Sequence, residues 1–168
     1  MLINAADSFT RPADTNAYAD GDLVANSTTA GSVVPLSFSV SRLKVGSGII
    51  RAARIFKDNQ VTTNATFTVH LFSQSPSVTN GDNGAFLPTT VEYWLGSIPV
   101  DLATNGVASG TDAVARGAPS AEINFDLWGF NATERRLYAL LEAGAAYTPA
   151  SAEIFSVVLE IMNGNSDV

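Results

Sequence analysis

The sequence predicts an all-β protein, an antiparallel β-sandwich of jelly-roll type. Several short segments alternate apolar and polar residues with a period of two, which is the pattern of half-buried strands. Long connections rich in Gly, Asn, Thr and Pro separate about eight such segments, and no segment has a convincing helical spacing. The long connections favour a jelly roll over an immunoglobulin-like sandwich.

The first part of the chain is expected to form an extended N-terminal arm at residues 1–31, followed by one sandwich domain at residues 32–168. Asp, Asn, Ala, Thr and Gly dominate the arm. Strands are expected where apolar residues alternate with polar ones, most clearly at 65–72 and less regularly at 33–41 and 49–56.

The second half begins with a long loop at 74–88, which holds prolines and two Asn-Gly turns. Gly96 and Pro99 give the strand expected at 93–100 a bulged or edge character. Residues 103–120 are interpreted as loop. Further strands are expected at 121–127, 136–142 and 153–161. The segment 136–142 fits helix or strand by periodicity, and its shortness favours a strand.

The composition indicates a protein that packs against other proteins. Charged residues make up 15% of the chain, whereas about 25% is usual for soluble domains, so small polar residues must cover much of the surface. The net charge is −7, and the nine Lys and Arg are scattered apart from Arg135-Arg136. Direct nucleic-acid binding needs a basic stripe and is not expected.

Several kinds of chemistry are not expected either. The chain has no cysteine, which excludes disulfides, thiolate metal sites and a thiol nucleophile. No apolar run approaches the roughly 20 residues of a membrane span, and no export signal is visible, so we expect synthesis in the cytosol and no membrane partner.

Candidate catalytic residues are few. His70 is the only histidine and lacks a G-x-S-x-G nucleophile motif. Carboxylates that pair across a cleft could cleave glycosides, but acids on strands usually solvate a sheet; those considered are Asp20, Asp22, Glu122, Asp126, Glu142, Glu153 and Glu160. Residues 80–84 (NGDNG) are oxygen-rich but lack a calcium-loop register. We therefore expect no catalytic residue, cofactor or metal.

Aromatic residues leave one alternative open. Tyr93, Trp94 and Trp128 could form a stacking platform for sugar rings, although tryptophans beside strand residues more often anchor a core or a subunit interface. The alternative function is a glycan-binding, or glycan-cleaving, β-sandwich module.

Four segments carry a resemblance to a known class of proteins. They are residues 9–27 (FTRPADTNAYADGDLVANS), 64–72 (NATFTVHLF), 80–83 (NGDN) and 140–151 (LLEAGAAYTPAS). They resemble small virion structural proteins of tailed bacteriophages. The resemblance implies a capsid decoration, or cement, protein: a β-sandwich, often trimeric, made in the bacterial cytoplasm and seated on the capsid surface where major capsid protein subunits meet. With this resemblance, the alternative glycan-binding, or glycan-cleaving, module would belong to a head fibre or tail, and a plain tail or neck component is a third possibility.

The expected partners are then the major capsid protein and further copies of the chain. The resemblance supplies no contact residues. The arm is the best candidate on physical grounds, because an unpaired extended segment with a few anchors can add to a sheet edge or wrap a partner. The predicted contact residues are Phe9, Arg11, Pro12 and Tyr18.

Overall fold

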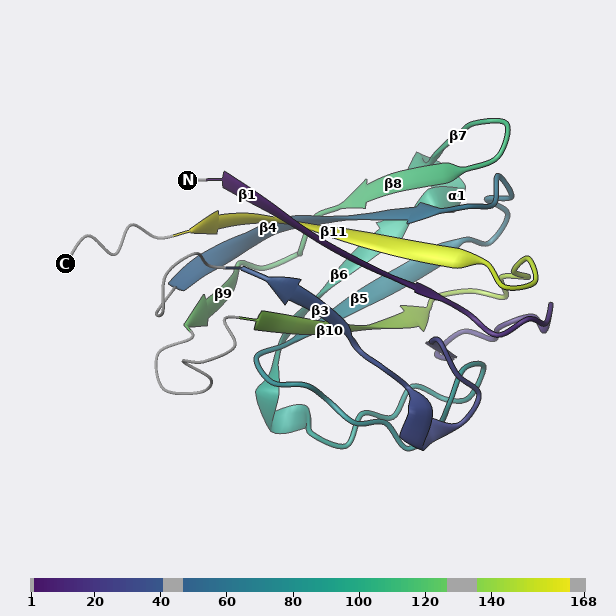
Figure 1. The fold of residues 1–168 in the computed structure, drawn as a ribbon. Helices are drawn as coiled ribbons and strands as arrows, with labels where there is room; N and C mark the ends of the chain where they lie inside the picture. Colours follow the sequence, from purple (N-terminus) through teal and green to yellow (C-terminus); the bar gives the residue numbers. More distant parts are fainter. Residues whose placement is uncertain (1, 41–46, 127–135, 164–168) are drawn as a thin grey trace.

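The computed structural model describes residues 2–40, 47–126 and 136–163 and confirms the all-β sandwich (Figure 1). Sheet I has the order β1-β11-β4-β8-β7, with β9 also paired to β4. Its strands are β1 (Leu2–Thr10), β11 (Ile154–Asn163), β4 (Ser47–Lys57), β8 (Ala113–Gly117), β7 (Val107–Ala108) and β9 (Ile123–Asp126). All of these pairings are antiparallel.

Sheet II packs against sheet I and has the order β2-β10-β5-β6, with β3 also paired to β10. Its strands are β2 (Leu23–Val24), β10 (Arg136–Ala143), β5 (Thr66–Phe72), β6 (Trp94–Asp101) and β3 (Leu36–Ser39). Three single helical turns complete the described elements: η1 (Ala30–Ser32), η2 (Val91–Tyr93) and α1 (Leu102–Asn105).

The core lies between the two sheets because apolar residues alternate along the strands. On β5, Phe67, Val69 and Leu71 are buried and point toward sheet I, as the alternation predicts. Phe67 packs edge-on against Phe155 of β11, with ring centroids 5.2 Å apart. Burial of such side chains is the main stabilising contribution to a sandwich of this size.

The N-terminus differs from the expected free arm. Leu2–Thr10 form β1, which pairs with β11 along its whole length, from Leu2↔Met162 to Thr10↔Ile154. Ala5 is buried and Phe9 stacks on Phe155, with centroids 5.7 Å apart. The sequence pattern missed this strand because Ala and Asp at inward positions give a weak hydrophobic alternation.

The segment 103–120 also differs, since it contains β7 and β8 rather than loop alone. The inward residues of β8 are alanines, Ala113 and Ala115, which carry little hydrophobic signal. Gly117 lets β8 approach β6: a Cβ at this position would lie 1.9 Å from the Pro99 carbonyl oxygen. Small residues here bring the backbones of the two sheets close together.

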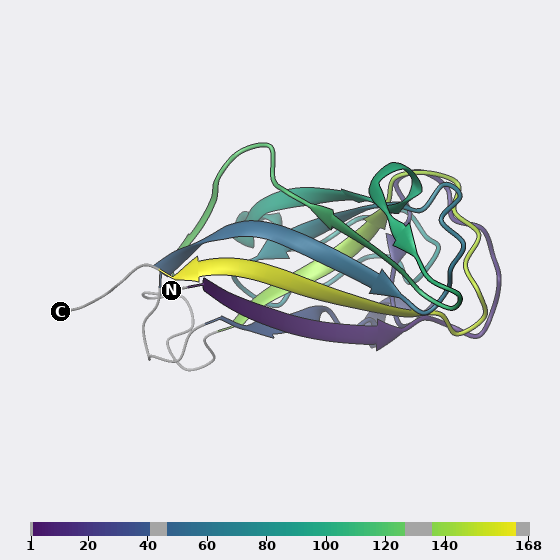
Figure 2. The ribbon, with the colours of Figure 1, turned by 90° about the horizontal axis from the view of Figure 1, so that it is seen from above.

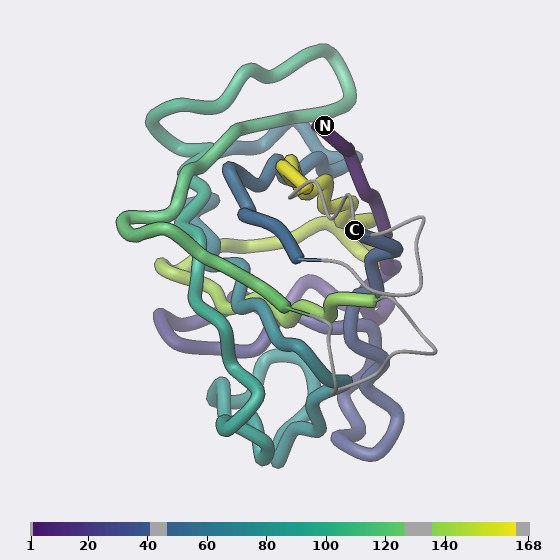
Figure 3. Tube along the Cα trace, turned by 90° about the vertical axis from the view of Figure 1, so that its left-hand side faces the viewer, coloured from purple at the N-terminus to yellow at the C-terminus, as the bar shows by residue number. Residues whose placement is uncertain are grey.

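Long connections cover the outer face of sheet II. Residues 73–93 and 25–35 lie over it and enclose a second apolar cluster (Figure 3). Its buried members are Leu23, Ala25, Phe72, Tyr138 and Leu140, against which Val33, Val78 and Phe86 pack. The chain therefore covers one of its sheets with its own loops.

Candidate functional site

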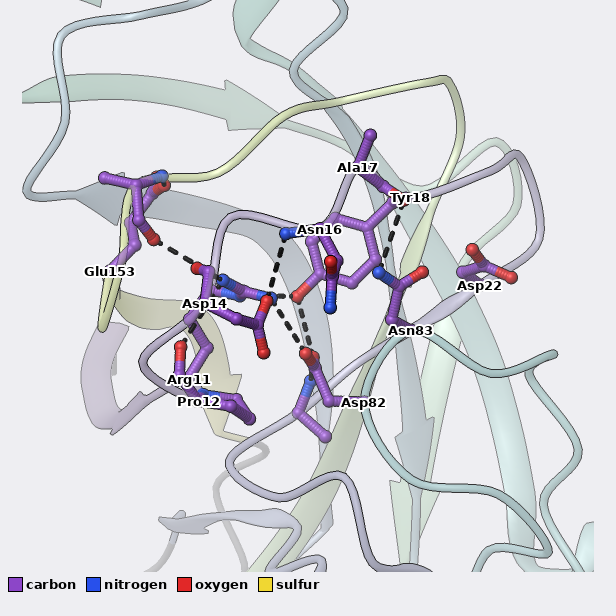
Figure 4. A network of polar contacts seen from close by, with 12 residues as sticks. Arg11, Pro12, Asp14, Asn16, Ala17, Tyr18, Asp22, Asp82, Asn83 and Glu153 are labelled. Atoms are coloured by element: carbon purple, nitrogen blue, oxygen red, sulfur yellow. Dashed lines mark hydrogen bonds and ion pairs between the residues drawn. The ribbon is translucent and has the colours of Figure 1, made fainter.

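A buried polar network holds the segment that follows β1 (Figure 4). Arg11 Nε donates a hydrogen bond to Tyr18 Oη (2.8 Å), and Arg11 Nη2 donates to Asp82 Oδ2 (2.9 Å). The side chains of Arg11 and Asp82 are both fully buried. Tyr18 Oη in turn donates to Asp82 Oδ1 (2.7 Å). The three groups form a closed triangle of charge-assisted hydrogen bonds.

Asp82 is the centre of this network. It also accepts a hydrogen bond from the Ala25 backbone N–H (2.8 Å), which ties in the chain after β2. Burial raises the pKa of Asp82, while the hydrogen bonds from Ala25 and Tyr18 and the charge of Arg11 oppose the rise. Asp82 belongs to the NGDNG loop, whose backbone turns aim its carboxylate inward.

The network fixes the loop formed by residues 12–17, which we name the pinned loop. Arg11 Nη1 donates to the Asp14 carbonyl oxygen (2.6 Å), and Arg11 Nη2 also donates to Asp14 Oδ1 (3.0 Å). Asp14 Oδ1 accepts a further bond from the Asn16 N–H (3.1 Å). Ala13 and residues 15–17 are exposed on this loop. It therefore presents small side chains on a fixed backbone.

The four predicted contact residues have different environments. Arg11 and Tyr18 are each only 2% exposed, so they act through the shape of the pinned loop rather than as surface contacts. Pro12 is half-buried, and its carbonyl accepts a hydrogen bond from the Ala152 N–H (3.2 Å). Phe9 is half-buried against Phe155. The structure brings Arg11 and Tyr18 together, and Phe9 belongs to the core packing.

A second buried network lies near the end of β4. Lys57 Nζ donates to Tyr147 Oη (3.0 Å) and lies 3.5 Å from Glu153 Oε1. Tyr147 Oη donates to Glu153 Oε1 (2.7 Å). Burial lowers the pKa of Lys57, although Glu153 opposes this. Sequence reasoning missed Lys57, yet its position two residues after the inward Ile55 was a usable signal.

His70 lies on the outer face of β5, opposite the core residues, as expected. Its Nε2 is 2.6 Å from Glu142 Oε2, and its ring stacks on Phe86 at 4.4 Å. Burial lowers the pKa of His70, and Glu142 acts in the opposite direction. The contact closes the loop 73–93 over sheet II.

Three of the other acids considered from the sequence each contact a partner of a different kind, rather than a second acid. Glu160 binds Arg116, Glu142 binds His70, and Glu153 is buried beside Tyr147, while Glu122 and Asp126 are exposed on β9 and its approach. Across 2–40, 47–126 and 136–163, no group of three metal-ligating side chains lies close enough to hold a metal ion.

The aromatic candidates are only partly described. Trp94 is 50% exposed at the start of β6, and Tyr93 beside it is half-buried. Trp128 lies outside the described residues. Of the alternative sugar platform, the structure therefore places one half-exposed indole and one half-buried phenol.

The outer face of sheet I, which we name the open face, carries exposed apolar side chains as well as charged ones. Five of the ten large exposed apolar side chains of the described residues belong to its strands: Leu2, Phe56, Val107, Ile154 and Met162. A groove of about 400 Å³ lies among Phe56, Val107, Val114 and Ile154, with Asp58 and Asp112 at its rim. Patches of this kind on a surface usually mark contacts with another protein.

Comparison with known proteins gave no assignment. The sequence matches no protein-family model, and no curated protein matches it. Within the described part of the chain, none of the helices has the length and hydropathy needed to cross a bilayer.

Proposed function

We propose that the chain is a non-enzymatic structural protein of a bacteriophage virion, which decorates and stabilises the capsid by binding the lattice of the major capsid protein. The virion assignment is supported by the resemblance of residues 9–27, 64–72, 80–83 and 140–151 to such proteins. The structural role is supported by the small number of charged residues and by buried ionisable groups that bind one another.

The observation that carries the proposal is the pinned loop, which presents small exposed side chains on a fixed backbone in a chain with few charges. At the same time, the buried ionisable groups satisfy one another: Arg11 with Asp82, and Lys57 with Tyr147 and Glu153. Such pairs fix loops and strands in place. A rigid sandwich with surfaces suited to protein contact is what a capsid-binding protein needs.

The pinned loop is the proposed contact with the capsid. Its exposed residues are small, so a partner surface can approach its backbone closely. Because Arg11, Asp14 and Asp82 already fix its conformation, little conformational entropy is lost on binding. The N-terminal region thus remains the proposed contact region. Residues 13 and 15–17 make the direct contacts in this proposal.

The test is to mix the purified chain with undecorated heads of the phage. We expect co-sedimentation with the heads and a rise in head melting temperature. Absence of both effects overturns the proposal. The double variant Thr15→Arg/Ala17→Arg should lose head binding, because long cations obstruct the pinned loop, whereas Ser75→Arg/Thr89→Arg, at exposed positions over sheet II, should bind like the wild type.

Trp94 supports a second candidate, a glycan-binding module, because half of this indole is accessible to stack on a sugar ring. A glycan array and a reducing-sugar assay distinguish the two. Binding to a glycan that is lost in the Trp94→Ala variant supports the glycan module. Binding to heads, with no binding to any glycan on the array, supports capsid decoration.

A further inference from the structure

We infer that the open face is the interface of a twofold homodimer, rather than of the trimer that the resemblance implies, in which sheet I of one copy stacks on sheet I of a second. Sheet II is covered by its own loops, whereas β1, β11 and β4 of sheet I lie uncovered in Figure 2. Sheet I also carries exposed apolar side chains, such as Phe56 and Ile154. The partner is identified as a second copy by the order of charges on the face. The inference does not depend on capsid binding.

The open face is built of rows of side chains that run across the strands. One row, which we name the axial row, contains Ser156, Phe56, Val114 and Val107, which are register partners on β11, β4, β8 and β7. Phe56 and Val107 are exposed, at 39% and 70%. The axial row is therefore the apolar centre of the groove.

One flanking row lies two positions away from the axial row on each strand. It contains Ile154 of β11, Asp58 after β4 and Asp112 before β8. Asp58 and Asp112 are exposed and line the groove. This row is acidic, with one apolar member.

The second flanking row lies on the other side of the axial row. It contains the register partners Val158 of β11, Arg54 of β4 and Arg116 of β8. Glu160 binds both arginines, Arg116 through Nη2 at 2.7 Å and Arg54 through Nε at 3.2 Å. Arg54 Nε is buried and its approach to Glu160 lacks hydrogen-bond geometry. Two cations sharing one anion leave this row positive.

These three rows are self-complementary under a twofold axis that runs along the axial row, within the interface. Such an axis stacks each strand on its counterpart in the partner and exchanges the two flanking rows. Asp58 then faces Arg54 of the second copy, and Asp112 faces its Arg116. Ile154 meets Val158 of the second copy, and the apolar side chains of the axial row meet one another. In the flanking rows, acid therefore faces base on β4 and β8, and apolar faces apolar on β11.

The test is the molar mass in solution, measured by light scattering after gel filtration over a range of concentrations. The wild type should have twice the chain mass of 17.6 kDa. Val114→Glu should be monomeric, because the twofold axis sets its two copies against each other. Asp112→Arg should weaken the dimer, because it opposes the partner's Arg116. Leu87→Glu, at a 52% exposed position over sheet II, should stay dimeric.

A second measurement separates loss of the interface from loss of folding. The chain has no cysteine, so Val114→Cys introduces a single thiol on the proposed axis. Because stacked sheets lie roughly 10 Å apart, too far for a direct disulfide, a short bis-maleimide reagent should link two Val114→Cys chains rapidly, and Leu87→Cys chains should not link under the same conditions. A wild type that is monomeric at every concentration, or an oligomer that Val114→Glu leaves intact, overturns the inference. So does failure of Val114→Cys to cross-link while its melting temperature matches the wild type.

Discussion

Arg11 and Asp82 are separated by 71 positions in the sequence and form an ion pair of 2.9 Å between two fully buried side chains. This pair joins the chain after β1 to the NGDNG loop that precedes β6. The ion pair therefore links β1 of sheet I to the connections that cover sheet II.

Removing one partner of this pair should cost substantial stability. Asp82→Ala leaves the Arg11 guanidinium buried without its main counter-charge, and we expect a loss of about 3–5 kcal/mol in the free energy of unfolding, measured in urea. Asp20→Ala removes an exposed acid and should change it by less than about 0.5 kcal/mol. Equal losses in the two variants would contradict the role assigned to Asp82.

The Lys57 and Glu153 pair should behave as a coupled unit. Lys57→Met should lower the free energy of unfolding by about 3–5 kcal/mol, because it removes one partner of a buried ion pair and leaves Glu153 without it. The double variant Lys57→Met/Glu153→Gln should recover part of this loss, since both charges are then removed. A double-mutant cycle in urea measures the coupling, and simple additivity of the two single losses would argue against it.

Stability should depend on pH through His70. Burial lowers its pKa in the folded state below the ordinary 6.5. As pH falls from about 7 to about 5, the unfolded chain takes up this proton before the folded chain does, so the melting temperature should fall. His70 is the only histidine, so His70→Gln should flatten the profile in this range. A wild-type melting temperature that rises on acidification would show that Glu142 dominates instead.

Gly81 should tolerate no side chain. A Cβ at this position would lie 2.1 Å from the Thr28 carbonyl carbon and oxygen, which are backbone atoms. Gly81→Ala should therefore destabilise the fold by about 1–3 kcal/mol, measured by thermal unfolding, and disturb the adjacent Asp82. Gly110 has open space around it, so Gly110→Ala is the matched control and should be close to neutral.

The strands with a strong alternation were predictable and those with small inward residues were not. Residues 65–72 and 153–161 correspond to β5 and β11, because large apolar residues recur at every second position. Residues 136–142 correspond to β10, where the shortness of the segment decided for a strand. β1 and β8 place alanines at inward positions, where burial comes from backbone approach rather than from side-chain size.

The buried networks depended on partners far along the chain. Arg11 and Tyr18 were predicted as contacts with a partner, because local sequence shows neither Asp82 nor the connection that buries them. Lys57 lies two residues after the inward Ile55 and so occupies an inward position of β4. Its burial, however, requires Tyr147 and Glu153 from other segments.

The sequence by itself determined the class of the fold, since a period-two alternation with Gly- and Pro-containing connections allows strands and little helix. It also determined a surface with few charges. The tertiary structure alone decided which sheet is covered and which is open. Side chains such as Phe72 and Phe56 both point away from the sandwich core, and only the path of distant connections buries the first and exposes the second.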